Sequence, residues 1–146
     1  SALQERSRSE GDLAVAHVDD GVAAGEAGAG ELMRSVPSTT ALVCYNDLTA
    51  VGALRALHSA GLQVPHDISV VGFDDIELAP YVVPPLTTVR QQTDEIGRWA
   101  VDTLIDAIAA GFEPSERHAA DAHERAVEPV RIPVELVVRD STGPVA

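Results

Sequence analysis

The apolar residues of the stretch 40–75 follow three patterns in succession. Residues 41–45 form a short and almost wholly apolar run, typical of a strand buried on both faces of a parallel sheet. Helical spacing follows, with apolar residues at Leu48, Val51, Leu54 and Leu57, and Gly61 stands where a left-handed residue ends such a helix. A second β-rich run contains Ile68, Val70, Val71 and Phe73. The stretch therefore predicts a strand, a crossover helix and a second, parallel strand.

The residues before this unit predict a short strand and an alanine-rich helix. Residues 13–18 are mostly apolar and end at Asp19-Asp20-Gly21, as expected for a strand and its turn. Residues 22–36 predict a helix, with core positions at Val22, Ala29, Leu32, Met33 and Val36. Three glycines at 25, 28 and 30 weaken this helix by about 1 kcal/mol each relative to alanine. A phosphate loop is disfavoured, because the order GxxGxG lacks a following Lys-Ser/Thr, so we expect close helix packing.

The residues after the unit begin with a loop over 76–83, which the pair Pro84-Pro85 ends. Residues 86–90 are β-rich. A helix then starts at Thr93 or Asp94 and runs to residue 110, with an apolar stripe at Ile96, Trp99, Ala100, Leu104 and Ile108.

The last third of the chain predicts a loop or weak helix over the acidic residues 113–127, followed by one strand. In residues 130–138 apolar side chains alternate with mostly polar ones, at Val130, Ile132, Val134, Leu136 and Val138. This alternation predicts a strand with one buried face, and Pro133 places it at a sheet edge.

Composition narrows the class of protein. The formal charge of −13 argues against direct contact with DNA, which requires clustered Lys and Arg. The single cysteine, Cys44, permits no internal disulfide, which fits a reducing compartment. Without an apolar run long enough to span a bilayer, the default expectation is a soluble, cytoplasmic protein.

Polar residues follow both strands of the central unit. Asn46-Asp47 ends the first strand and Asp74-Asp75 ends the second, so we expect the two pairs to share one edge of the sheet, where α/β proteins bind ligands. Asp47 is expected to cap the helix, and Asp75 to tie a loop. The Asn46 amide donates and accepts, and the Asp74 carboxylate accepts twice, which suits vicinal sugar hydroxyls.

The sequence ALVCYNDLTAVGALRALHSAGLQVPHDISVVGFDD, followed by PPLTTVRQ and later by IPVELVVRDST, resembles the effector-binding region of LacI/GalR bacterial transcription regulators. The resemblance implies an α/β, periplasmic-binding-protein-like fold with two lobes that close on a small molecule. It assigns residues 1–88 and 130–146 to the C-terminal lobe, and residues 89–129 to a crossing helix and loop of the other lobe, whose sheet is missing.

The resemblance also implies roles for particular residues. Positions matching Asn46 and Asp74 contact effector in several family members, and Tyr45 and Thr93 are further candidates. The dimer face would include Val51, Arg55, Tyr81 and Val82. Operator DNA would be bound by a separate head absent from this chain.

Two other classes of protein remain open. A periplasmic sugar-binding protein shares the fold and would be identified by a secretory signal upstream. An enzyme finds little support: Asp74 and Asp75, adjacent on an extended chain, would point opposite ways, and Cys44 has no evident His partner. His118 and His123 do not match a helical metal site. We expect no cofactor and no metal.

Overall fold

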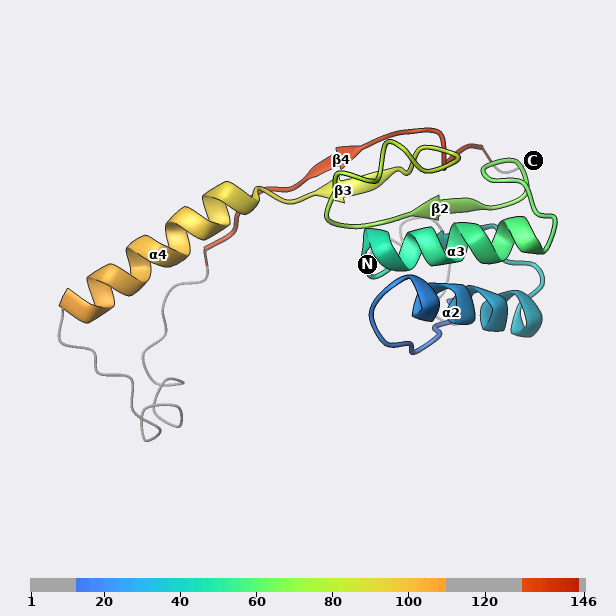
Figure 1. Ribbon diagram of the computed structural model, residues 1–146, viewed down its shortest axis with the longest axis horizontal. Coiled ribbons are helices and arrows are strands. Elements are labelled where there is room, and N and C mark those ends of the chain that lie inside the picture. The colour runs from blue at the N-terminus through green and yellow to red at the C-terminus, as the bar shows by residue number, and fades with distance from the viewer. Residues whose placement is uncertain (1–12, 110–129, 145–146) are drawn as a thin grey trace. The chain divides into compact units, whose positions relative to one another are not determined.

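The computed structural model describes residues 13–109 and 130–144. The chain divides into two compact units, Ser1–Arg90 with Glu135–Ala146, and Gln91–Val134. The first unit contains α2 (Val22–Ser35), β1 (Ala41–Val43), α3 (Asp47–Ser59), β2 (Ser69–Val71), β3 (Thr88–Arg90) and β4 (Glu135–Val137) (Figure 1). The second contains α4 (Thr93–Ala109). The predicted assignment of residues 89–129 to another lobe stays a prediction.

The strands of the first unit form a mixed arrangement. β1 and β2 pair in parallel, with Leu42 opposite Val70, which confirms the predicted strand–helix–strand unit. The residues after β2 continue the parallel order toward β3, through bonds from Gly72 N–H to Thr87 O (3.0 Å) and from Asp74 N–H to Val89 O of β3 (2.9 Å). β4 then pairs with β3 in antiparallel register, with Leu136 opposite Val89.

The core lies between the helices and the strands. α2 and α3 run side by side along one side of β2 (Figure 1), and the core contains Ala29, Leu42, Ala50, Ala53, Leu54, Leu57, Ile68, Val70, Ala79 and Leu86. Leu54 and Leu57 are buried as expected, whereas Leu48 is exposed and Val51 is half-buried. Gly61 has the expected left-handed backbone, with φ 76°.

The glycines of α2 explain how the two helices pack. A Cβ on Gly25 would lie 2.0 Å from Thr49 O, and one on Gly52 of α3 would lie 1.9 Å from Val22 O. Both positions therefore require glycine for the backbones to approach this closely. The expectation of a closely packed helix is confirmed.

Three predicted strands differ from the structure. Residues 13–18 form no strand, and β1 is shorter than 41–45 and buried only at Leu42. Residues 130–134 are irregular, and Leu136 in β4 is exposed, so the predicted buried face of 130–138 is wrong. The common physical cause is that an apolar run becomes a buried strand only where a second strand or a helix covers it, and the described residues supply no such cover here.

The predicted helix over 93–110 is confirmed in α4. None of its residues is buried, and its large exposed apolar side chains are Trp99, Val101, Leu104, Ile105 and Ile108. Residues 113–127 and Gly111 lie outside the described residues.

Candidate functional site

The carboxyl ends of β1 and β2 form one edge of the first unit. Their parallel register continues past both strands, because Asp47 N–H donates to Phe73 O at 2.8 Å. Asn46-Asp47 and Asp74-Asp75 consequently lie on neighbouring chains, as predicted. We call this edge, with residues Asp20, Asn46, Asp47, Asp74 and Asp75, the rim.

Asn46, not Asp47, caps α3. Its Oδ1 accepts the N–H of Thr49 at 2.9 Å, and its Nδ2 donates to Asp20 Oδ1 at 2.6 Å. The prediction that Asp47 caps the helix is wrong, because the capping side chain belongs to the residue before the first helical turn. The contact also brings Asp20 to the rim, which sequence reasoning missed. The sequence did contain a signal for this placement. Asp20 follows the apolar run 13–18, just as the other rim residues follow apolar runs.

Asp47 has a structural role at the first position of α3. Its side chain is fully buried and accepts hydrogen bonds from Ile76 N–H at 2.9 Å and from the Thr88 hydroxyl at 2.5 Å. These bonds tie the loop after β2 and the start of β3 to the helix. Asp47 therefore holds a loop and a strand in place and does not cap the helix.

Asp74 and Asp75 both have left-handed backbone conformations, with φ 112° and 56°. The prediction of an extended chain at this point is wrong. Such conformations cost on the order of 1–3 kcal/mol each in residues other than glycine, and persist where surrounding contacts determine them. Here Asp74 N–H donates to Val89 O and Ile76 N–H donates to Asp47, so the turn is held on both sides.

The Asp75 carboxylate lies between two arginines. Arg90 Nε donates to its Oδ2 and Arg139 Nη2 donates to its Oδ1, both at 2.6 Å. Burial acts to raise the pKa of Asp75, but the hydrogen bonds from Arg139 and Arg90 outweigh it and lower that pKa. Asp75 therefore ties the turn to β3 and to the chain after β4, as expected.

The side chains of the rim all lie at one edge of the first unit. Asp47 accepts bonds from Ile76 N–H and Thr88, Asp75 accepts bonds from two arginines, and Asn46 caps α3 and bonds to Asp20. The half-buried Asp74 lies beside them. Amide and carboxylate groups at one edge can bind a ligand that carries several hydroxyl groups. Nothing in this set supplies a nucleophile with an adjacent base.

The other predicted ligand contacts lie in different places. Tyr45, just beyond β1, is 80% exposed, and Thr93 is the first residue of α4 in the second unit. The predicted dimer residues Val51 and Arg55 lie on α3, while Tyr81 and Val82 lie in the loop after β2. Arg55 pairs with Glu26 of α2 at 3.4 Å, and Tyr81 is 75% exposed.

Cys44 lies beside the rim but is a weak nucleophile. Burial, reinforced by the charge of Asp47, raises the pKa of its thiol to about 11. Across residues 13–109 and 130–144 no group of His, Cys, Asp and Glu is arranged to hold a metal ion. His118 and His123 lie outside the described residues. In the same described part, no helix has the length and apolar character required to cross a membrane.

Comparison with known families accounts for this architecture. Residues 2–142 match the model of the periplasmic binding protein-like domain. The chain belongs to this family. Within it, the chain is part of an effector-binding domain of the LacI/GalR type of regulator, as the resemblance implied.

Two curated relatives are transcription regulators. A ribose operon repressor of Escherichia coli is 57% identical over 63 residues, which are 43% of this chain and 19% of the repressor. An uncharacterised regulator with a helix-turn-helix, from Streptomyces limosus, is 43% identical over 122 residues, 84% of this chain and 31% of that protein. The domain described here therefore spans less than a third of either relative.

Solved structures show the same fold. A LacI family transcriptional regulator from Enterococcus faecium with bound ribose has a TM-score of 0.78 at 29% identity. The comparison covers 99% of this chain and 49% of that regulator.

Proposed function

We propose that this chain is the effector-sensing and dimerisation portion of a LacI-type transcription regulator, and that it binds a small, sugar-like ligand at the rim. The observation that carries the proposal is the shared edge at which Asn46 and Asp74 lie, held by the buried Asp47 and Asp75. The role is non-catalytic and cytoplasmic, as is usual for a repressor.

Hydroxyl-rich ligands suit this edge. A sugar hydroxyl both donates and accepts, so Asp74 would accept from one hydroxyl while the Asn46 amide contacts a neighbour. Tyr45 and Thr93 are further proposed contacts. The similarity to a ribose operon repressor and to a regulator with bound ribose supports a sugar as the ligand class.

The regulatory step follows from differential binding. A ligand that contacts both lobes stabilises one lobe orientation over another, by as much as its affinities for the two orientations differ. A separate DNA-binding head would read that orientation. The charge of −13 supports operator contact through such a head and not through this domain.

Dimerisation is proposed through α3 and the loop after β2. Val51, Arg55, Tyr81 and Val82 would form this face, and the exposure of Arg55 and Tyr81 leaves both side chains accessible to a second copy. A sugar-binding protein of the periplasm is the alternative. The similarity to repressors favours the regulator.

Replacing Asp74 in the full-length regulator tests the ligand site. Asp74→Ala removes charge-assisted hydrogen bonds worth about 1.5–3 kcal/mol, so the affinity for D-ribose should fall roughly tenfold or more. Isothermal titration calorimetry measures the affinity, and thermal unfolding should show that the variant remains folded.

Glu77→Ala is the matched control, because Glu77 is an exposed acid three positions further along the same loop. Its affinity for ribose should equal that of the wild type. Wild-type affinity in Asp74→Ala would show that Asp74 is only structural. The isolated domain should bind ribose only weakly, since sugar pockets of this kind bury most of the ligand between two walls.

A further inference from the structure

Arg90 lies where three segments of the first unit meet. It is the last residue of β3, and its partner in the antiparallel pair with β4 is Glu135. On its other side, Arg90 forms a parallel bridge with Asp74, the proposed ligand contact. The second unit, Gln91–Val134, begins directly after Arg90 and ends directly before Glu135. Arg90 is therefore next to the rim and also next to both points at which the chain leaves and re-enters the first unit.

The Arg90 side chain joins the same neighbours as its backbone. Its Nε donates to Asp75 Oδ2 at 2.6 Å, and its Nη1 donates to Glu135 Oε2 at 3.2 Å. Asp75 follows Asp74 in the left-handed turn, so one guanidinium links this turn to β4. A guanidinium suits this task, because its five N–H groups have a fixed geometry and can serve two carboxylates at once.

The two arginines that contact Asp75 differ in their surroundings. The side chain of Arg139 is 17% exposed and also donates to Leu86 O at 2.7 Å, so it satisfies Asp75 from within the first unit. The side chain of Arg90 is 44% exposed, and that of its second partner, Glu135, is 60% exposed. Exposed ion pairs contribute little to folding. Stability therefore depends mainly on Arg139, and the link from Arg90 to Glu135 calls for another explanation.

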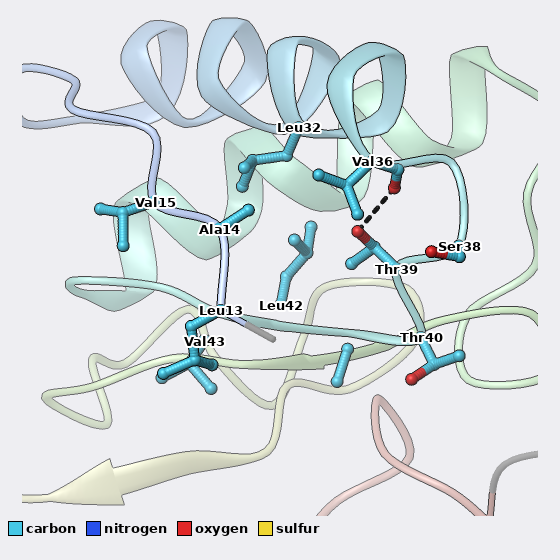
Figure 2. Close-up of a pocket in the computed structure, with 11 residues that line it drawn as sticks. Leu13, Ala14, Val15, Leu32, Val36, Ser38, Thr39, Thr40, Leu42 and Val43 are labelled. Carbon is cyan, nitrogen blue, oxygen red and sulfur yellow. Dashed lines mark hydrogen bonds between the residues drawn. The ribbon is translucent and has the colours of Figure 1, made fainter. Parts of the chain in front are cut away.

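The side of the first unit at β1 is uncharged by comparison. A cavity of about 690 Å³ lies there, between residues 13–15, the end of α2 and residues 38–43 (Figure 2). None of the residues that line it carries a charge, and the hydrogen bond drawn in Figure 2 joins neutral groups, the Thr39 hydroxyl and Val36 O, at 2.7 Å. The ionic link from the rim therefore runs on the side of β3, through Arg90.

We propose that Arg90 is a positioning residue that couples ligand binding at the rim to β3 and β4, by holding Asp75 and Glu135 at the same time. The inference rests on the proposed function, in which the ligand contacts Asp74. A bound ligand restricts the turn that carries Asp74, the turn restricts the neighbouring Asp75, and Asp75 restricts Arg90 and its partner Glu135. The ligand then favours one arrangement of the two strands, by as much as its affinities for the alternative arrangements differ. Arg90 acts through Asp75 and not by contact with the ligand.

Two variants of the full-length regulator test the coupling, Arg90→Gln and Glu135→Gln. Both leave Asp75 paired with Arg139, so the affinity for D-ribose should change by no more than about threefold, and the melting temperature by no more than about 2 °C. The measured response is the ratio of DNA affinities with and without ribose, from anisotropy titrations of a duplex that the wild type selects from random DNA. This ratio should fall toward one, by at least about fivefold in Arg90→Gln and by less in Glu135→Gln. Arg34→Gln, which removes an exposed positive charge from α2, is the control and should respond like the wild type.

The double variant supplies a readout that a purely structural role would not produce. Because Arg90 and Glu135 act through one link, the variant with both changes should lose no more of the ribose response than Arg90→Gln alone. Arg139→Gln provides the contrast in stability. It should lower the melting temperature by at least about 4 °C, because Asp75 and Leu86 O lose a partner that is shielded from water.

The outcomes separate this inference from the proposed function. A ribose response that is unchanged in either Arg90→Gln or Glu135→Gln, while the wild type responds, would overturn the coupling and leave the proposed function standing. So would additive losses in the double variant, or a loss of ribose affinity in Arg90→Gln that accounts for its whole loss of response. A wild type whose DNA affinity does not depend on ribose would overturn the proposed function, and this inference with it.

Discussion

At the scale of single residues, the rim depends on two buried carboxylates that are not proposed to contact ligand. Asp47 accepts bonds from the loop after β2 and from β3, and Asp75 accepts from Arg90 and Arg139. Together they hold the left-handed turn that carries Asp74. Removing such a carboxylate costs most where its partner is itself shielded from water, as the buried Thr88 hydroxyl and the 17% exposed Arg139 are. The pair with Arg90, which is 44% exposed, contributes less.

Asp75→Asn should lower the free energy of unfolding by about 2 kcal/mol at pH 7, because the two arginines lose an ionised acceptor. The folded pKa of Asp75 lies below its unfolded value of about 3.9, so the ionised pairs stabilise the fold above that pH and are lost as pH falls through the folded pKa. The difference between wild type and variant should hold from pH 5 to 7 and shrink below pH 4, as measured by urea unfolding. Asp140→Asn, at an exposed acid in the same unit, is the control. A difference that grows on acidification would contradict this assignment.

At the scale of elements, glycine decides how α2 and α3 meet. Gly25 and Gly52 face each other's helix so closely that any Cβ would overlap backbone atoms. The low helix propensity of glycine is offset by the burial that the close approach allows. The same packing positions α3, whose first residues carry Asn46 and Asp47 to the rim.

Gly52→Ala should destabilise the fold by about 1–3 kcal/mol or more, because its Cβ would lie 1.9 Å from Val22 O and the helices must move apart. Gly30→Ala is the matched control in α2, since its Cβ would meet only the end of the Arg34 side chain, at 3.4 Å. That change should be neutral or stabilise the helix by about 1 kcal/mol. Chemical denaturation measures both, and equal stability of the two variants would contradict this account of the helix packing.

At the scale of the whole molecule, exposed apolar side chains favour self-association, and the net negative charge opposes it. α4 exposes Trp99, Val101, Leu104, Ile105 and Ile108, and none of its residues is buried. Each large apolar side chain contributes about 1.5–3 kcal/mol when buried, which favours association. The charge of −13 opposes it, and salt screens that repulsion beyond roughly 8–10 Å.

The domain should therefore self-associate, forming a dimer as protein concentration and salt rise. Leu104→Lys should shift sedimentation toward the monomer, because it places a charge on the apolar face of α4. Asp102→Asn changes the net charge by the same amount without touching that face, so it should leave association unchanged or slightly stronger. A single 15 kDa species at every concentration and salt level would rule out the dimer.

The local sequence pattern alone predicted the strand–helix–strand unit of residues 40–75 and the sheet edge at which its two strands end. The apolar run, the helical spacing and the second run determined a parallel pair, because covalent order and period leave few other arrangements. The polar residues after each strand therefore lay on one edge, and Asn46 and Asp74 could be named as candidates. The helices over 22–36 and 93–110 followed from the same kind of periodicity.

Tertiary structure decided what depends on neighbours distant in sequence. It determined that Asn46 and not Asp47 caps α3, and that Asp20 reaches the rim. Among residues 13–109 and 130–144 it gave the stretch 13–18 no strand partner, and it exposed most of the apolar face predicted for 130–138. An apolar run shows that a segment can form a buried strand. Burial also requires another strand or helix that packs against the segment, and only the tertiary structure shows whether such an element is there.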